Sequence, residues 1–245
     1  TYRVPIIALG DPAQIPPISK DEDNHVLEHP HIFLDEVMRQ AKESDIIRLS
    51  MDIREGKKIS PFKGIDAQVF YTKNIIDGMY KWADQILVAT NRNRTLINNH
   101  MRNAGNCGEE PEIGDKIICL RNCWETSSIA EGNPLVNGTI GWINSLKYDE
   151  IPYMVGGERI TAPVLWADIT TDADMFKNIL IDYQSLKSGI KFFTPRQEYL
   201  ARKSKKNPDL PIEFNYGYAI TTHRAQGSQW PKVLVIEENF PFDKD

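Results

Sequence analysis

The stretch Ile86-Leu-Val-Ala-Thr90 is followed, after a short gap, by Thr95-Leu-Ile-Asn-Asn-His-Met-Arg102. A short apolar run of the first kind is typical of a buried strand, and the second stretch has the pattern of a helix that follows such a strand. A continuous apolar run from Val4 to Leu9 ends at Gly10, and Gln68 to Thr72 is a further strand-like segment. This alternation of strands and helices predicts a parallel α/β sheet domain.

A helix is expected from Ser44 to Gly56. Ser44 is a suitable N-cap, Ile46, Leu49 and Ile53 recur at helical spacing, and Gly56 suits the position just after the helix. The segment thus carries both a start and a stop signal.

After Gly105 the pattern changes to short runs rich in β-branched and aromatic residues, with turn-forming glycines between them and no convincing helix. The runs are 116–120, 139–146 and 160–169, and the turns are Asn137-Gly138 and Gly156-Gly157. They predict a small all-β module. From Phe214 the chain returns to a strand, a loop and a second buried strand at 233–236, so this module is expected to be an insertion in the α/β domain.

The composition is that of a globular protein without a strong electrostatic signature. The chain has 245 residues and a net charge of -5, so no global basic field points to a nucleic-acid partner. Cys107, Cys119 and Cys123 are too few, and odd in number, for a disulfide framework, and no nearby histidine completes a zinc site. No apolar run is long enough for a membrane span. We expect a cytoplasmic protein that contacts no membrane.

The loop Gly10-Asp-Pro-Ala-Gln-Ile-Pro-Pro17 follows the first apolar run, at a strand end where open α/β sheets bind ligands. Gln14 offers a hydrogen-bond donor and an acceptor, which suits a residue that senses a phosphate or a water molecule. Taken alone, the same residues also fit a rigid polar turn.

A second polar loop, Tyr218-Ala-Ile-Thr-Thr-His-Arg-Ala-Gln-Gly-Ser-Gln-Trp230, follows another expected strand. The hydroxyls of Thr221 and Thr222 can bond to phosphate oxygens of a nucleic-acid backbone, and His223 can stack on a base or donate to a phosphate. Gly227 allows a ligand to approach the backbone closely. By itself, His223 fits a purely structural hydrogen-bonding role equally well.

Together these two loops resemble motifs III (GDxxQLPP) and V (YAxTxHKSQGSE) of superfamily 1 helicases. Other segments match the RecD/Dda branch in the same order, and the similarity covers nearly the whole chain. They are EVMRQ at 36–40 and DIREGK at 52–57 for motif IV, LVATNRNRTLIN at 87–98 for the strand and helix after it, and GDKIICLRN at 114–122 with LVNGTIGWI at 135–143 for an SH3-like insertion.

The resemblance implies a RecA-like parallel-sheet domain, the second motor domain of a P-loop NTPase, with an inserted SH3-like β module. Residues 1–18 would be the tail of the first RecA-like domain, 19–105 and 207–245 the second (2A), and 106–206 the insertion (2B). The implied activity is that of an ATP-dependent 5′→3′ DNA helicase that moves along single-stranded DNA.

By the same resemblance, Gln14 would couple nucleotide state to the strand, and Arg39 would be the arginine finger on the γ-phosphate. The other ATP-contacting residues would be Gly10, Asp11, Gln226, Gly227 and Gln229. The residues that contact DNA would be Pro16, Pro17, Thr90, Asn91, Asn137, Thr221, Thr222 and His223. Because Gln229 stands where the family has glutamate, the charge-assisted bond of that carboxylate to the nucleotide is not available here.

The sequence holds no GxxxxGK[ST] loop, and the Asp-Glu pair for Mg²⁺ is expected upstream of Thr1. We therefore expect a fragment with half of an ATP site, in which ATP and Mg²⁺ bind only together with the missing N-terminal motor domain. Further expected partners are single-stranded DNA and nuclease or replication and recombination proteins. RecD, the exodeoxyribonuclease V alpha subunit, acts within a nuclease complex, whereas the phage enzyme Dda acts alone.

Several alternatives stay open. An RNA helicase of the same branch, or a non-catalytic nucleic-acid clamp, would carry the same motifs. The basic residues between 187 and 206 fit either a solvated loop or a patch that grips the nucleic-acid backbone. Trp124, Trp142 and Trp166 occupy strand-like positions, which favours core packing over base stacking.

We predict that the purified chain does not hydrolyse ATP, because it lacks the loop and the lysine that hold the phosphates. The measurement is phosphate release with and without single-stranded DNA. Turnover that persists after removal of contaminating ATPases would contradict the prediction.

Overall fold

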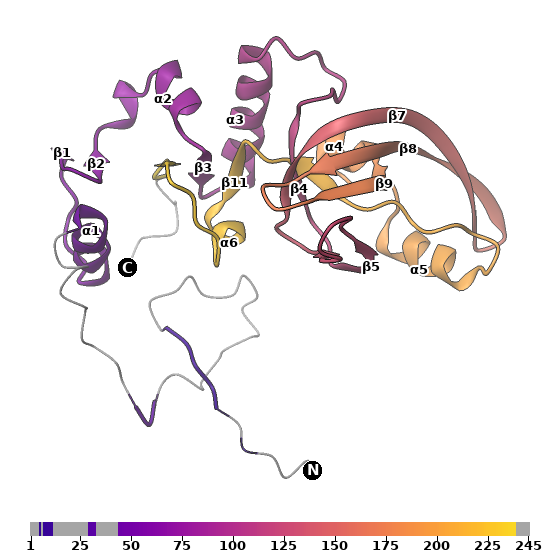
Figure 1. The fold of residues 1–245 in the computed structure, drawn as a ribbon, viewed down its shortest axis with the longest axis horizontal. Coiled ribbons are helices and arrows are strands. Elements are labelled where there is room, and N and C mark those ends of the chain that lie inside the picture. The colour runs from indigo at the N-terminus through magenta and orange to yellow at the C-terminus, as the bar shows by residue number, and fades with distance from the viewer. Residues whose placement is uncertain (1–4, 6, 12–28, 33–43, 239–245) are drawn as a thin grey trace. The chain divides into compact units, whose positions relative to one another are not determined.

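The computed structural model describes residues 5, 7–11, 29–32 and 44–238 (Figure 1). The chain divides into two compact units, Thr1–Ile76 and Asp77–Asp245. It is a mixed α/β protein with one parallel sheet and one larger antiparallel sheet, both in the second unit.

The first unit contains α1 (Asp45–Arg54), β1 (Phe62–Lys63), β2 (Gln68–Val69) and the 3-10 helix η3 (Thr72–Asn74). The predicted helix is confirmed. The Ser44 hydroxyl accepts a hydrogen bond from the Ile47 amide, and Gly56 follows the helix with a positive φ. The expected strand at 68–72 is wrong beyond Val69, because Tyr71 accepts a hydrogen bond from the Asn74 amide and begins a helical turn. The part that is a strand pairs antiparallel with β1.

Two aspartate carboxylates, one from α1 and one from the β1–β2 turn, hold the start of α1 against that turn. Asp45 accepts hydrogen bonds from the Ile65 amide at 2.6 Å and from Arg48 at 2.5 Å. Asp66 accepts from the Ser44 hydroxyl at 2.6 Å and from the Asp45 amide at 2.7 Å. The bond from the Asp45 amide satisfies one of the amides that a helix start leaves without an intrahelical partner.

The expected buried strand at 4–9 is not formed in its described part. Residues 7–9 have no strand conformation, and Ile7 and Leu9 are 85% and 92% exposed. A strand buried on both faces needs neighbouring strands and covering layers, and no described segment pairs with it.

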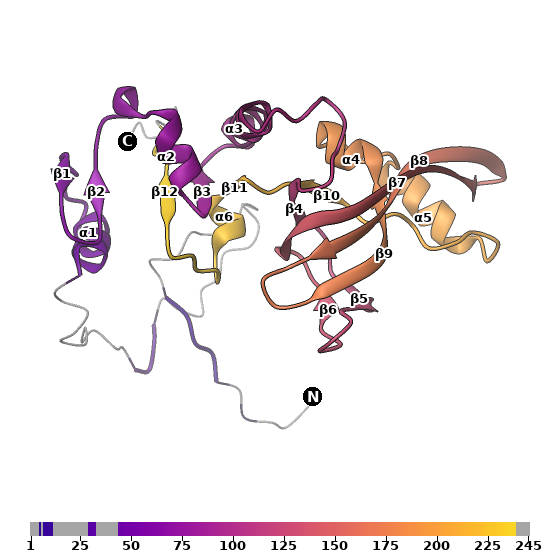
Figure 2. The same cartoon turned by 45° about the horizontal axis from the view of Figure 1, so that its top comes forward.

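The parallel sheet has the strand order β11 (Ala219–Thr221), β3 (Gln85–Val88), β12 (Val233–Val235), and both pairings with β3 are parallel. This confirms the predicted parallel sheet. The predicted helix at 95–102 lies within α3 (Asn91–Ala104), which follows β3. The short helix α2 (Asp77–Trp82) precedes β3 (Figure 2). Thr90 begins α3 as its N-cap and accepts a hydrogen bond from the Asn93 amide.

The antiparallel sheet has the strand order β10-β4-β7-β8-β9. The strands are β4 (Lys116–Cys119), β7 (Ile140–Val155), β8 (Glu158–Thr170), β9 (Met175–Asp182) and β10 (Phe214–Tyr216). A separate small ribbon is formed by β5 (Cys123–Ser127) and β6 (Pro134–Leu135). Figure 1 shows β7 and β8 as long curved strands. Their connection is the predicted Gly156-Gly157 turn, in which both residues have positive φ, as a tight two-residue hairpin turn requires.

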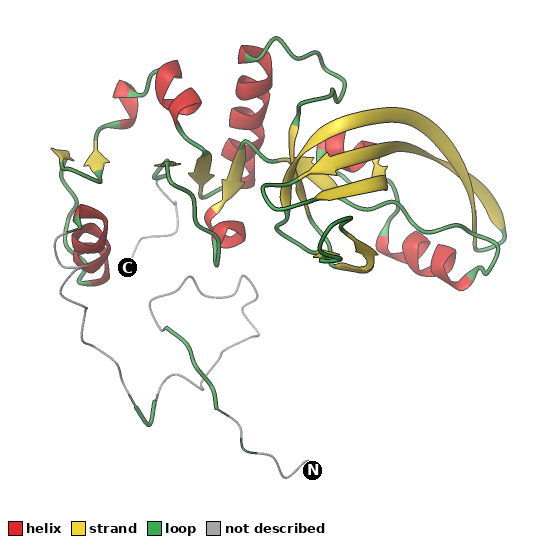
Figure 3. Ribbon diagram, in the orientation of Figure 1, coloured by secondary structure: helices red, strands yellow, loops and turns green. Residues whose placement is uncertain are grey.

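The expectation of an all-β module at 106–206 is wrong after β9, although no helix interrupts the expected strand-like runs between 116 and 169. Two helices follow β9, namely α4 (Tyr183–Ser188) and α5 (Pro195–Lys203), as Figure 3 shows. Asp182 caps α4, and Thr194 forms a capping box with Gln197 at the start of α5. These caps stabilise helices whose composition alone resembles a charged loop.

Polar side chains join the two sheets within the second unit. The Asn98 side chain on α3 donates to the Tyr216 and Ala219 carbonyls and accepts from the Ala219 amide. The Lys116 ammonium on β4 donates to the Asp84 carbonyl at 2.7 Å and to Gln85 Oε1 at 2.9 Å. Burial lowers the pKa of Lys116 to about 8.

No helix in the described part of the chain is long and apolar enough to cross a lipid bilayer.

We predict that Lys116 makes the free energy of unfolding rise with pH. Between pH 8 and 10.5 the folded protein has released the Lys116 proton while the unfolded chain, with an ordinary lysine pKa, still holds it. The unfolded state then binds more protons, so raising the pH stabilises the fold, by roughly 1–3 kcal/mol over this range.

The measurement is urea unfolding from pH 7 to 10.5 of the wild type, Lys116→Met and the exposed control Lys147→Met. The rise should be smaller in Lys116→Met and unchanged in Lys147→Met. Parallel curves for all three proteins would show that Lys116 does not titrate in this range.

Candidate nucleic-acid interface

The carboxyl edge of the parallel sheet gathers polar groups from segments far apart in the sequence. β3 and β11 run side by side in the same direction, with Val88 paired to Thr221, so Thr90 and Thr222 both follow the same edge. Open α/β sheets bind ligands at this edge, where loops and helix starts expose polar groups.

The segment that resembles motif V forms β11, the short helix α6 (Thr222–Ala225) and an exposed loop. Thr221 is buried at the end of β11, whereas Thr222 and His223 are half-buried on α6. Gly227 has a φ of +81°, and no atom lies within 4 Å of the position of a Cβ there. The backbone at Gly227 therefore suits only glycine and is open to a ligand.

Glu238 holds the end of β3 in place. Its carboxylate accepts hydrogen bonds from the Ala89 amide at 2.8 Å, the Thr90 amide at 3.1 Å and the Thr90 hydroxyl at 2.7 Å. Burial raises the pKa of Glu238, but the hydrogen bonds from Thr90 and Ala89 outweigh it, and the pKa is lower than usual. The Thr90 hydroxyl thus donates to Glu238 and caps α3, whereas the next side chain, Asn91, is exposed.

Two arginines at this edge were not among the predicted site residues. Arg94 lies in the first turns of α3 after β3, and Arg224 lies on α6 after β11. Both are half-buried, and burial lowers the pKa of each. They stand inside segments that the helicase resemblance had singled out, but no local sequence pattern distinguishes them from surface cations.

The other predicted site residues that the structure describes lie outside β3, β11, α3 and α6. Gly10 and Asp11 belong to the first unit, where Asp11 forms an ion pair with Arg54 at 2.6 Å. Asn137 is exposed in the turn before β7, where its amide donates to Asn122 Oδ1. Gln226 and Gln229 are exposed beside Gly227. Gln14, Pro16, Pro17 and Arg39 lie outside the described residues.

Within the described residues, no group of three or more histidine, cysteine, aspartate or glutamate side chains could hold a metal ion. That the whole protein has no metal centre stays a prediction.

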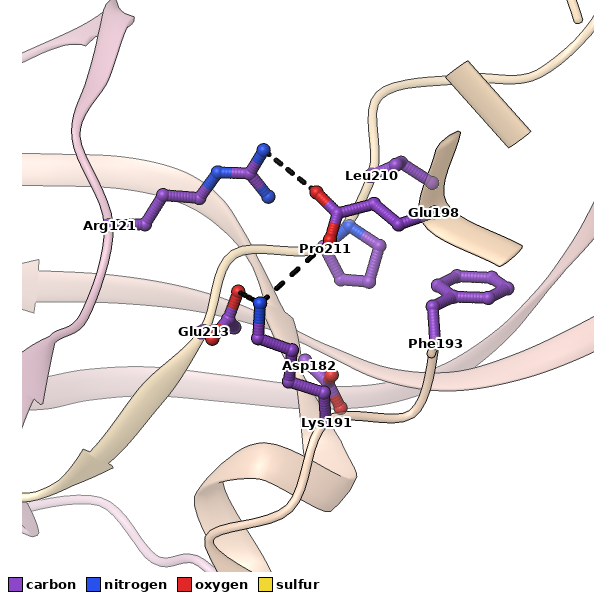
Figure 4. Close-up of a pocket in the computed structure, with 8 residues that line it drawn as sticks. All are labelled: Arg121, Asp182, Lys191, Phe193, Glu198, Leu210, Pro211 and Glu213. Carbon is purple, nitrogen blue, oxygen red and sulfur yellow. Dashed lines mark ion pairs between the residues drawn. The ribbon is translucent and has the colours of Figure 1, made fainter. Parts of the chain in front are cut away.

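Part of the basic cluster at 187–206 is neutralised by carboxylates around a small pocket between α5 and the segment before β10 (Figure 4). Lys191 pairs with Glu213 at 2.5 Å and with Glu198 at 3.8 Å. Glu198 also pairs with Arg121 and Arg202, each at 2.9 Å. Because every cation that lines this pocket is ion-paired, the pocket is poorly suited to an anionic ligand.

Other members of the cluster are exposed and have no ion pair with the described part of the chain. They are Arg196 and Lys203 on α5, with Lys205 and Lys206 after it. Tyr199 is also exposed and lies between Arg196 and Lys203 on the same face of α5. The Lys203 ammonium is 4.5 Å from the centre of the Tyr199 ring. The interpretation of this region as a loop is wrong where α4 ends at Ser188 and where α5 runs from Pro195 to Lys203, but 189–194 and the residues after Lys203 are loop.

The expectation of core packing is wrong for Trp124, which is 67% exposed on β5, whereas Trp142 and Trp166 are partly buried in the antiparallel sheet. The β5–β6 ribbon has only two strands, so its outer face has no neighbouring layer to cover Trp124.

No family model matches this chain, and no curated protein matches it either.

We predict that replacing Lys203, Lys205 and Lys206 together by glutamine weakens binding to single-stranded DNA and flattens its salt dependence. For every phosphate that is no longer neutralised, the slope of log affinity against log salt should fall by about 0.7. The measurement is fluorescence anisotropy between about 50 and 200 mM KCl. Lys57→Gln is the control, since its ammonium is paired with Asp52 and Glu55. An unchanged slope would show that these lysines do not bind DNA phosphates and are only solvated surface charges.

Proposed function

We propose that this chain forms the strand-gripping portion of an ATP-dependent 5′→3′ DNA helicase of superfamily 1B, the RecD/Dda type. In this proposal the parallel sheet belongs to a RecA-like second motor domain (2A), and the antiparallel sheet includes an SH3-like insertion (2B). The complete protein would work with single-stranded DNA, a first motor domain, and nuclease or replication and recombination partners.

One observation supports this proposal most directly. The segments that resemble motif V and the strand-helix element at 87–98 are separated by about half the chain, yet they form neighbouring strands of one parallel sheet. Their polar residues therefore follow the same edge. If the two segments resembled the helicase motifs only by chance, there would be no reason for them to form neighbouring strands.

The chemistry of this edge suits a nucleic-acid backbone better than a small neutral ligand. Thr222, His223 and Asn91 offer hydroxyl, imidazole and amide donors, and Arg94 and Arg224 add positive charge. Hydroxyl, amide and guanidinium groups are the usual partners of phosphate oxygens. A grip of this kind acts on the backbone and does not read base sequence, as a translocating motor requires.

The described residues fit ATP only in part. Gly227 leaves open space beside the exposed Gln226 and Gln229, which would contact the nucleotide by the resemblance, together with Gly10, Asp11, Gln14 and Arg39. Bound ATP with Mg²⁺ would supply the free energy of hydrolysis for movement. The contribution of this chain would be to orient the strand through Thr222 and His223 and to place Arg39 as a cation for the γ-phosphate.

We predict that the chain binds a single strand and that His223→Ala and Thr222→Ala each weaken this binding about fivefold, the effect expected for one stacking or phosphate contact. The probe is a labelled oligothymidylate of about 15 nucleotides, measured by anisotropy. His100→Ala is the matched control, because His100 lies on α3 beside Asp77, in the same unit but in the C-terminal half of that helix.

Equal affinity for an oligouridylate would favour the RNA helicase alternative. Strand binding by a full-length protein that lacks ATPase activity would favour the non-catalytic clamp. No binding of the wild type to either strand, with the fold intact by circular dichroism, would contradict the proposal.

A further inference from the structure

Arg94 and Arg224 are brought together by the parallel sheet. β3 leads into α3 and β11 leads into α6, and the two strands are direct neighbours. The charge on Arg224 lowers the pKa of Arg94, which adds to the larger effect of burial. The two arginines therefore follow neighbouring strands at the same edge of the sheet, and their positive charges are unfavourable to one another.

Neither guanidinium has a hydrogen bond or an ion pair with any described residue. Nη1 of Arg224 is buried and has no hydrogen-bond partner. The nearest acid to influence Arg224 is Glu213, which raises the pKa of Arg224, but burial outweighs this effect. Glu213 is also committed to Lys191, with which it forms an ion pair at 2.5 Å.

Two uncharged residues, Gly189 and Asn215, also lie near Arg94. Its Nη2 atom lies 3.8 Å from the position of a Cβ on Gly189, and Asn215 Oδ1 lies 3.7 Å from the same point. Gly189 ends α4, and the buried Asn215 is on β10. The Asn215 amide group donates to the Ser185 and Phe214 carbonyls, so it holds this wall of the site in position.

Two neighbouring, partly desolvated cations that have no ion pair among the described residues are unfavourable for folding. Burial of a charge is costly unless it is paired, and a buried guanidinium N–H without an acceptor adds to that cost. Such an arrangement is typical of a binding site, where the ligand supplies what the fold lacks. The planar guanidinium donates in a fork that matches the oxygens of a phosphate group.

We propose that Arg94 and Arg224 together form a phosphate-binding site, and that its occupant is a backbone phosphate of the strand held at the carboxyl edge of the sheet. The identity of the occupant rests on the proposed function, whereas recognition of a phosphate by the pair does not. A nucleotide phosphate has the same chemistry, and the second experiment separates it from the strand.

The first experiment measures anisotropy of the labelled oligothymidylate with Arg94→Gln, Arg224→Gln and the control Arg92→Gln. Arg92 lies on the same turn of α3 but is exposed. Each variant of the pair should lose about fivefold in affinity, and its salt slope should fall by about 0.7, while Arg92→Gln changes less than either. Arg94→Lys and Arg224→Lys should keep the slope but not the full affinity, because lysine has no planar fork.

The second experiment measures the melting temperature (Tm) of the same variants without ligand and with pyrophosphate, ATP or the oligothymidylate. Without ligand, removal of either arginine should leave Tm unchanged or raise it, since an unpaired cation is removed. Pyrophosphate should raise the Tm of the wild type more than that of Arg94→Gln or Arg224→Gln. A larger effect of ATP than of the oligothymidylate at equal phosphate concentration would show that the occupant is a nucleotide and would overturn the assignment to the strand.

Failure of this inference differs from failure of the proposed function. If the wild type binds the strand but both variants match Arg92→Gln, the pair is not a site and the function stands. If the wild type binds no strand but pyrophosphate stabilises it through the pair, the phosphate site stands and the function fails. A lower Tm in both variants, with unchanged salt slope and pyrophosphate response, would assign the arginines to the fold and overturn the proposal.

Discussion

The ion pair between Arg102 and Asp115 is the constraint on which the arrangement of the second unit depends. Both side chains are almost fully buried, and the guanidinium binds the carboxylate through Nε at 2.9 Å and Nη2 at 3.1 Å. Tyr218 donates to the same carboxylate at 3.1 Å, and the Arg102 guanidinium lies 4.3 Å from the centre of the Tyr216 ring. A buried pair is stable only when its hydrogen-bonding groups are satisfied, and these contacts achieve that.

This pair determines which segments meet. Arg102 is on α3, Asp115 immediately precedes β4, and Tyr216 and Tyr218 flank the junction between β10 and β11. One charged cluster therefore joins the helix of the parallel sheet to the antiparallel sheet, next to the segment that becomes β11. Asn98 on the same helix adds hydrogen bonds to the Tyr216 and Ala219 backbone. As a result β11 is fixed beside β3, and the residues after the two strands share one edge.

Local signals in the sequence were sufficient where the structure is local. Ser44 and Gly56 fixed the ends of α1, and Gly156-Gly157 fixed the hairpin turn, because caps and turns depend on a few neighbouring residues. Burial was harder to predict, since it depends on which other layers are present. The apolar run with Ile7 and Leu9 has a buried-strand pattern, yet the described part of the chain provides no sheet to cover it.

The helices α4 and α5 show a different limit. The sequence did contain Thr194-Pro195 followed by Gln197, a start signal for a helix, but the surrounding basic residues favoured a loop interpretation. The site was predictable to the level of the segment. Thr90 and Thr221 to His223 do follow adjacent strands, whereas the role of Glu238 in holding Thr90 depends on the return of the chain through β12.

A net charge of -5 is compatible with a sheet edge that binds a nucleic-acid strand, because the positions of the charged side chains matter more than their sum. Exposed charges more than about 10 Å apart are screened at ordinary salt concentrations, so the many surface acids contribute little at the sheet edge. Arg94 and Arg224 are half-buried, where screening is weaker and each charge acts more strongly on a nearby anion. Among the described acids, Glu213 pairs with Lys191, and Glu238 accepts hydrogen bonds from Ala89 and Thr90 just after β3. An acidic protein can therefore hold a polyanion through a few desolvated arginines, and it need not attract nucleic acid over its whole surface.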